Sequence, residues 1–106
     1  MTRAAVIARV EAFPVPYRET NDHGSIRWSC LARVEDADGV VGWGEAACIA
    51  RAAALSTAIM IEGHAAALIG VQADPASADG VMRRTGWWIG GAGIDSFAVS
   101  AIDMAL

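Results

Sequence analysis

The chain has 106 residues, of which 55% are hydrophobic and 19% are charged, and its formal net charge is −4 at pH 7. This length and composition indicate one globular domain, or a piece of one, and exclude an intrinsically disordered chain. The negative charge argues against nucleic acid as a partner, because a nucleic-acid footprint needs a basic patch. All eight basic residues are arginines, so no lysine of this chain can form a Schiff base or act as a general base.

The apolar segments are too short for membrane insertion. No run approaches the ~20 apolar residues of a membrane span, and Arg9 interrupts the N-terminal apolar run before it reaches the length of a signal peptide. We therefore expect no membrane partner and a cytoplasmic location. Cys30 and Cys48 are the only cysteines, and without a secretory signal they are expected to be buried, reduced thiols.

The first third of the chain has the pattern of β-strands. Residues 4–13 mix β-branched and apolar side chains, and place Arg9 and Glu11 on the same face of a predicted strand. Pro14 and Pro16 have no N–H to donate, so strand pairing is predicted to stop there. The polar residues 15–24 are then predicted to form a long loop, a kind of segment that is often functional.

A second and a third strand complete the predicted sheet. Apolar and polar residues alternate over residues 26–35, which indicates a half-buried strand. Residues 36–39 (DADG) form a hairpin turn in which Gly39 supplies the positive φ, and residues 40–45 return. The sequence predicts a three-stranded antiparallel meander.

Beyond Ala46 the pattern changes to that of helices. Alanine is dense up to Gly70, a predicted C-terminal cap, and the expected apolar face of this helix contains Leu55, Ile59, Gly63, Ala66 and Ile69. Asp74 and Pro75 are predicted to cap and open a second, short helix that breaks near Gly86.

The last predicted helix follows an aromatic, glycine-rich connector at residues 87–93 and starts near Asp95. Its apolar face is predicted to contain Ile94, Phe97, Ala98, Ala101, Ile102 and Ala105. No glycine, proline or cationic turn ends this helix, so we expect the chain to be cut within it. The predicted fold class is α+β: a three-stranded antiparallel β-meander followed by a bundle of about three helices.

Most short motifs do not support a site. His23 and His64 have no partner at zinc-ligand spacing, and the turn at residues 36–39 lacks the later ligands of a calcium loop. The glycines at residues 90–93 precede a helix, but Ser96 stands where a dinucleotide fingerprint has its third glycine, and no strand precedes them. No hydrolase triad around Cys48 is evident, and the adjacent Trp87 and Trp88 are interpreted as packing residues.

The loop at residues 15–24 is the best functional candidate. It offers Tyr17, Arg18, Asn21 and His23 on one predicted mobile segment. Arginine suits carboxylate recognition, because its fork donates two parallel hydrogen bonds. The alternative is a solvated surface loop.

Three motifs in register carry a family resemblance. They are residues 40–46 (VVGWGEA), residues 68–70 (LIG) followed by Asp74 and Pro75, and residues 98–106 (AVSAIDMAL). Together they resemble the N-terminal domain of the enolase superfamily, in its mandelate racemase and muconate lactonizing enzyme branch. The resemblance covers nearly the whole chain and implies that residues 1–106 are a capping domain, truncated in its last helix before a (β/α)₈ barrel.

The resemblance implies a division of labour between cap and barrel. Such enzymes abstract the proton next to a carboxylate, and Mg²⁺ stabilises the resulting enediolate. In the family, the barrel carries the catalytic bases and the metal ligands, so this chain alone has no catalytic residue and binds no metal. The cap contributes two loops over the site, here residues 15–24 and residues 46–51. The implied substrate contacts are Tyr17, Arg18 and His23, and the implied apolar wall is Cys48 and Ile49.

The resemblance also implies the partners: a small-molecule carboxylate, the chain's own C-terminal barrel, and further copies in a homo-oligomer. The polar first loop and the tryptophan-rich connector favour an acid-sugar dehydratase. A racemase, an epimerase or a cycloisomerase of the same superfamily is the alternative. A stand-alone α+β interaction module and a regulatory subunit that docks on a separate barrel chain are also open.

Overall fold

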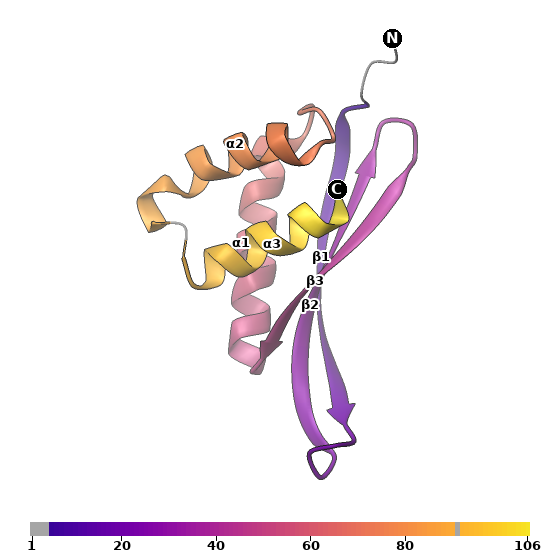
Figure 1. The fold of residues 1–106 in the computed structure, drawn as a ribbon, viewed down its shortest axis with the longest axis vertical. Coiled ribbons are helices and arrows are strands. Elements are labelled where there is room, and N and C mark those ends of the chain that lie inside the picture. Colours follow the sequence, from indigo (N-terminus) through magenta and orange to yellow (C-terminus); the bar gives the residue numbers. More distant parts are fainter. Residues whose placement is uncertain (1–4, 91) are drawn as a thin grey trace.

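The fold is a single antiparallel sheet with helices on one face. The computed structural model describes residues 5–90 and 92–106. The elements are β1 (Ile7–Glu19), β2 (Ser25–Asp36), β3 (Val41–Ile49), α1 (Arg51–Leu68), α2 (Pro75–Gly86), the short 3₁₀ helix η1 (Trp87–Ile89) and α3 (Ile94–Ala105). The strands follow one another in the order β1-β2-β3 (Figure 1). This confirms the predicted α+β meander followed by helices.

Strand β1 is longer than predicted and runs through both prolines. Pro14 pairs with Cys30, Pro16 pairs with Trp28, and the ladder continues to Glu19. The prediction that pairing stops at Pro14 is wrong, because β1 is an edge strand. An edge strand tolerates proline at alternate positions, where the missing N–H would face away from the neighbouring strand. The predicted loop at residues 15–24 shrinks to residues 20–24, and Ala4, the predicted strand start, lies outside the described residues.

Strand β3 also extends further than predicted, to Ile49, and α1 begins at Arg51 instead of directly after Ala46. Ala46 and Cys48 are buried, whereas Ala47 and Ile49 are exposed, which is the alternation of a strand. Small apolar residues are compatible with a helix or a strand, and here the pairing of Ala46 with Cys30 on β2 stabilises the strand. The predicted second loop at residues 46–51 is therefore mostly strand.

The turn between β2 and β3 confirms the hairpin prediction. Gly39 has φ 84°, and Asp36 Oδ1 accepts hydrogen bonds from the backbone N–H of Asp38 at 2.9 Å and of Val40 at 3.0 Å. The Asp36 carboxylate thus stabilises the turn by accepting hydrogen bonds from its backbone, which is why aspartate is favoured at the start of such turns.

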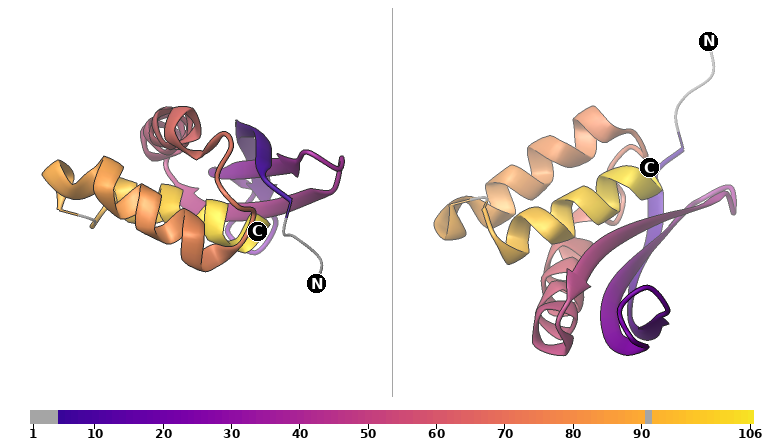
Figure 2. Two further views of the ribbon diagram at one scale, coloured as in Figure 1. Left: turned by 90° about the horizontal axis from the view of Figure 1, so that it is seen from above. Right: turned by 60° about the horizontal axis from the view of Figure 1, so that its bottom comes forward.

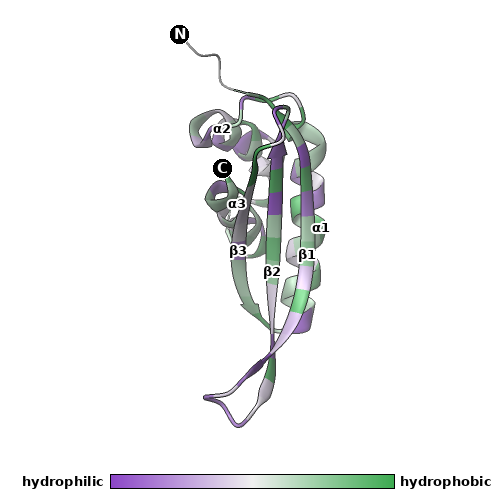
Figure 3. Ribbon diagram, turned by 90° about the vertical axis from the view of Figure 1, so that its right-hand side faces the viewer, coloured by the Kyte–Doolittle hydropathy of each residue, from purple (hydrophilic) through white to green (hydrophobic). Residues whose placement is uncertain are grey.

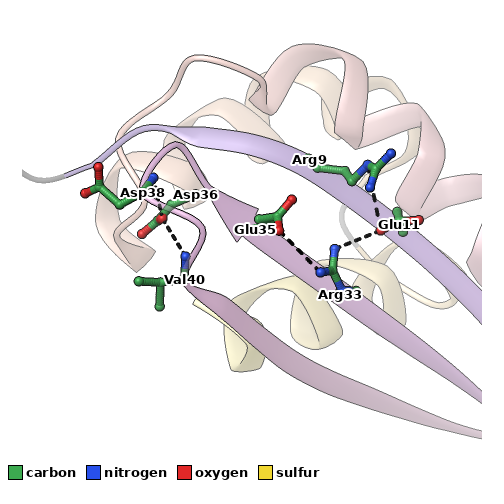
Figure 4. A network of polar contacts seen from close by, with 7 residues as sticks. All are labelled: Arg9, Glu11, Arg33, Glu35, Asp36, Asp38 and Val40. Carbon is green, nitrogen blue, oxygen red and sulfur yellow. Dashed lines mark hydrogen bonds and ion pairs between the residues drawn. The ribbon is translucent and has the colours of Figure 1, made fainter.

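The sheet face that no helix covers carries an ion-pair network next to this turn (Figure 4). Arg33 donates to Glu11 at 3.0 Å and to Glu35 at 3.4 Å, and Arg9 lies 3.9 Å from Glu11, as their predicted shared face requires. These pairs are partly exposed, so each contributes little to stability.

Helix α3 lies against β3 through an unusually close backbone contact. A Cβ atom at Gly42 would lie 1.8 Å from the carbonyl oxygen of Ala105, and one at Gly44 would lie 1.8 Å from that of Ala101. Only glycine at these positions leaves room for the helix backbone. The glycine motif of β3 and the alanine-rich motif of α3 therefore form one packing interface.

The buried face of α1 differs from the predicted one. The predicted face includes Ile59, which is 68% exposed, and Gly63, which is also exposed. The helix instead buries Ala54, Thr57, Ala58, Ile61, His64 and Leu68. Alanine occurs on every side of α1, so apolar spacing does not single out the face that meets the sheet.

The two further views in Figure 2 show the three helices grouped together on one side of the twisted sheet. Figure 3 shows the sheet from its uncovered side, with hydrophilic and hydrophobic residues in bands along the strands. Phe13 and Trp43 pack there across β2, with ring centroids 5.8 Å apart. The hairpin of β1 and β2 projects beyond the helices (Figure 1). This leaves the hairpin tip free of the rest of the domain.

Candidate functional site

The tip of the β1–β2 hairpin is a polar, internally bonded turn. The Arg18 guanidinium donates to the carbonyl of Gly24 at 2.9 Å and thereby ties the end of β1 to the start of β2. Asp22 accepts from the Ser25 hydroxyl at 2.8 Å and from Arg27 at 3.3 Å. These two partners, Ser25 first, lower the pKa of the Asp22 carboxyl below its ordinary value.

The three candidate substrate contacts differ in their placement at this tip. Tyr17 and Arg18 lie on β1, and Tyr17 is 40% exposed. His23 lies in the turn itself with φ 52°, a left-handed conformation that non-glycine residues adopt rarely. The end of the hairpin thus carries a phenol and a guanidinium on β1 and an imidazole in the turn.

The end of β3 holds the other two candidates. Cys48 is 7% exposed, lies on the sheet face toward α1, and has its Sγ 3.6 Å from the Thr57 hydroxyl. Ile49 is 52% exposed, has φ 66° and marks the abrupt exit from the strand. The Arg51 guanidinium that follows lies 5.8 Å from the centroid of the Trp28 ring.

The register brings both candidate segments to the same end of the sheet. Trp28 of β2 pairs with Pro16 on one side and with Ile49 on the other. Tyr17 and Arg18 follow directly after Pro16, so the hairpin tip and the end of β3 flank the same stretch of β2. Residues predicted from two separate segments therefore lie at the same end of the sheet, on either side of β2.

The two cysteines are free thiols in the core, as expected. Cys30 is completely buried, and burial together with the neighbouring Cys48 raises the pKa of its thiol to about 11. A thiol with so high a pKa is a poor nucleophile at neutral pH.

A buried pair that sequence spacing did not reveal joins α1 to α3. His64 Nε2 lies 2.7 Å from Asp95 Oδ1, and the two side chains are 1% and 3% exposed. With Nε2 as donor, the ring presents Nδ1 as an acceptor, and within the described residues Nδ1 has no hydrogen-bond partner. Asp95 also lines a groove of about 540 Å³ between α2 and α3.

Residues 5–90 and 92–106 contain no cluster of three or more His, Cys, Asp or Glu side chains that could hold a metal ion. In this same part of the chain, no helix combines the length and the apolar character that crossing a lipid bilayer requires.

Comparison with known proteins identifies the domain. The family model of the mandelate racemase/muconate lactonizing enzyme N-terminal domain matches residues 6–106. A search among curated proteins gave no match.

Solved structures agree with the family match. A mandelate racemase/muconate lactonizing enzyme from Bordetella bronchiseptica RB50 is 33% identical, with a TM-score of 0.80 over 98% of this chain and 29% of that one. An enolase from Bradyrhizobium complexed with magnesium and mandelic acid is 24% identical, with a TM-score of 0.81 over 97% of this chain and 30% of that one. The 3,6-anhydro-D-galactonate cycloisomerase from Zobellia galactanivorans is 22% identical, with a TM-score of 0.75 over 95% of this chain and 27% of that one. The chain thus spans about a third or less of the length of these structures.

Proposed function

The chain belongs to the family of mandelate racemase/muconate lactonizing enzyme N-terminal domains, and we propose that it caps the active site of a Mg²⁺-dependent enzyme of the enolase superfamily. The proposed enzyme abstracts a proton next to a carboxylate. The observation that carries the proposal is that the β1–β2 hairpin tip and the end of β3 lie at the same end of the sheet. The hairpin, which projects past the helices, can close over a site on another domain (Figure 1).

The proposed roles follow from placement and chemistry. Tyr17, Arg18 and His23 contact the polar end of the substrate, since the three side chains offer hydrogen-bond donors at the end of the hairpin. Ile49 supplies exposed apolar wall, and Cys48 supports it from the buried side of β3. Together the hairpin tip and the end of β3 exclude water from the substrate, and this exclusion strengthens electrostatic interactions at the reacting centre.

The proposed metal and bases lie outside this chain. The described residues do not fit a Mg²⁺ site, because no group of carboxylates converges. Mg²⁺ would be held by a C-terminal barrel, and it would stabilise the negative charge that develops when the substrate loses its proton. The proposed partners are that barrel, a small-molecule carboxylate and further copies in a homo-oligomer, and the proposed location is the cytoplasm.

Among substrates, we favour polyhydroxy acids and dehydration. Donor groups on the tip match a substrate with several hydroxyls better than an aromatic one. Dehydration removes the proton at C2 and expels hydroxide from C3, and the resulting enol becomes a 2-keto acid. The alternatives are racemisation or epimerisation, which return the proton to C2, and cycloisomerisation; the similarity to a cycloisomerase of an anhydro-sugar acid supports the last of these.

The test uses the complete enzyme and compares Arg18→Ala and His23→Ala with Arg9→Ala. Arg9 lies at the opposite end of β1 from the hairpin tip. The two tip variants should lose at least about tenfold in kcat/KM, or about 1.4 kcal/mol, and Arg9→Ala should not. Unchanged kcat/KM in both tip variants refutes the capping roles.

A screen of sugar acids with the complete enzyme separates the reactions. A new 2-keto acid carbonyl identifies dehydration, whereas exchange of the C2 proton with solvent deuterium without loss of water identifies racemisation or epimerisation. No turnover with any carboxylate would instead favour the non-catalytic interaction module.

A further inference from the structure

The junction between β3 and α1 contains a strained backbone. Ile49 ends β3 with φ 66°, and α1 begins two residues later at Arg51. The Ala50 N–H donates to the Cys48 carbonyl at 2.7 Å, which closes a three-residue γ-turn around Ile49. A γ-turn whose central residue has a positive φ is the rare and strained form. Ile49 occupies that central position.

Isoleucine is unsuited to this conformation. A positive φ brings Cβ close to the following carbonyl oxygen, and a β-branched residue is a clear outlier there, whereas glycine adopts it without cost. His23, with φ 52°, is a different case, because histidine is enriched in this region and lies here in a turn. Strained residues concentrate at functional sites, where a side chain must be held in one position. The strain at Ile49 therefore points to a use for its side chain.

The surrounding structure holds this turn in place. Ile49 pairs with Trp28, and the register shifts between Trp28 and Ser29, so that β3 has one more residue here than β2. Such a bulge bends its strand and re-aims side chains. On the other side of the turn, the Ala50 carbonyl accepts the first hydrogen bond of α1, from the Ala54 N–H at 3.1 Å. A strand and a helix thus fix both ends of the turn, and Ile49 cannot relax unless one of them gives way.

Ile49 also belongs to an apolar row across the end of the sheet. Trp28 on the central strand pairs with Pro16 on β1 and with Ile49 on β3, and paired residues share a face of a sheet. Trp28 packs partly against the core, whereas Pro16 is exposed and Ile49 is 52% exposed. Tyr17 and Arg18, two of the proposed polar contacts, follow Pro16 directly. The proposed site therefore combines hydrogen-bond donors with an apolar surface.

We propose that Ile49 is a specificity-determining residue, which the strained turn holds against an apolar end of the substrate. This inference rests on the proposed function and narrows its substrate class to hydroxy acids that end, remote from the carboxylate, in a methyl group instead of a hydroxymethyl group. A methyl group gains from contact with isoleucine, whereas a hydroxymethyl group would lose a hydrogen bond to water without replacement. A side chain on a fixed backbone also needs no ordering when the substrate binds, which favours affinity.

Urea unfolding of the 106-residue chain tests the strain without any substrate. Ile49→Gly and Ile49→Ala both remove the side chain, but only glycine relieves a positive φ. The equilibrium constant for unfolding should be at least about threefold lower for Ile49→Gly than for Ile49→Ala. The control is Ala47→Gly, at an exposed position of the same strand outside the turn, where glycine should raise this constant about two- to fivefold. A chain with Ile49→Ala that is as stable as one with Ile49→Gly, or more stable, overturns the proposal.

The complete enzyme tests the substrate contact. The probes are a 6-deoxyhexonate and the matching hexonate, in the configuration that the screen of sugar acids finds to be turned over. The native enzyme should favour the methyl-ended acid at least about tenfold in kcat/KM, and Ile49→Val should keep this preference. Ile49→Ala and Ile49→Gly should reduce it to about threefold or less. The control Ile59→Ala, on an exposed part of α1, should keep the full preference.

The outcomes separate this inference from the function on which it rests. Turnover of both acids without a preference for the methyl group, or with an equal preference in Ile49→Ala, overturns the role of Ile49 and leaves the proposed function standing. Turnover of carboxylates other than hydroxy acids does the same. Turnover of no carboxylate refutes the proposed function, and the substrate contact of Ile49 with it.

Discussion

Replacement of Gly44 by alanine tests whether the glycine motif exists to let α3 approach β3. The added Cβ would lie 1.8 Å from the Ala101 carbonyl oxygen, 2.8 Å from its carbon and 3.0 Å from Met104 Cβ. Because favourable contacts lie near 3.5 Å, the helix would have to retreat by about 1.7 Å. Backbone atoms of a helix cannot rotate away as a flexible side chain would.

The expected loss is at the upper end of the range for overpacking. Retreat of α3 also loosens the completely buried Ala98, Ala101 and Ile102. We expect Gly44→Ala to lower the free energy of unfolding by about 3 kcal/mol or more, and the melting temperature by more than about 10 °C. That is a large share of the total stability of a small domain, about 5–15 kcal/mol.

Urea unfolding followed by far-UV circular dichroism measures the change, and Gly63→Ala is the control. Gly63 lies within α1, and a Cβ there meets nothing within 4 Å. This variant should be neutral or more stable by about 0.5–1 kcal/mol, because alanine favours helix. If Gly44→Ala differs from the native chain by less than about 0.5 kcal/mol, the close packing of α3 on β3 is refuted.

Three further predictions concern buried and capping groups. Asp74 accepts from the Ser77 N–H at 2.8 Å, and the pKa of its carboxyl is lowered from 3.8, chiefly by that bond. A carboxyl whose pKa is lower in the folded than in the unfolded state stabilises the fold at pH values above its unfolded-state pKa. This stabilisation is lost as the pH falls through the folded-state pKa. Asp74→Ala should therefore reduce the melting temperature at neutral pH but much less at about pH 2. Iodoacetamide at about pH 8 should leave Cys30 unmodified in the folded chain, since the pKa of its thiol is about 11. In urea the reagent should modify Cys30, as mass spectrometry would show. Modification without urea would contradict the burial of Cys30. His64→Ala should lower the free energy of unfolding in urea by about 3–5 kcal/mol, because it leaves the Asp95 carboxylate buried without its donor. His64→Gln should lower it less. Equal losses in the two variants would show that the hydrogen bond does not cause the effect.

Local signals in the sequence predicted the elements well where neighbouring residues alone decide the structure. Asp36 and Gly39 form the predicted turn, and Asp74 caps α2 directly before the proline that begins it. In each case a side chain bonds to backbone groups two to four residues away, so the rest of the fold has little influence. The α+β class followed from these boundaries.

Predictions that depended on the position of an element in the fold were less successful. Pro14 and Pro16 are compatible with a strand only because β1 lies at the edge of the sheet, and the sequence does not state which strand is the edge. The face of α1 was mispredicted because the partner surface, not the helix, decides which alanines are buried. The first error bears on the candidate site, since it moved Tyr17 and Arg18 from a loop onto a strand.

The pair of His64 and Asp95 shows what could have been found. Each residue lies on the buried stripe of its helix: His64 in line with Ile61 and Leu68 on α1, and Asp95 in line with Ala98 and Ile102 on α3. Ligand spacing along the chain gave no partner for His64, because the two residues are 31 positions apart. A polar residue on a buried stripe must find a partner on the facing element, since an unpaired buried group is costly. One histidine and one aspartate on two such stripes therefore predict that α1 and α3 pack together, and this packing in turn places Asp95 at the groove beside α2.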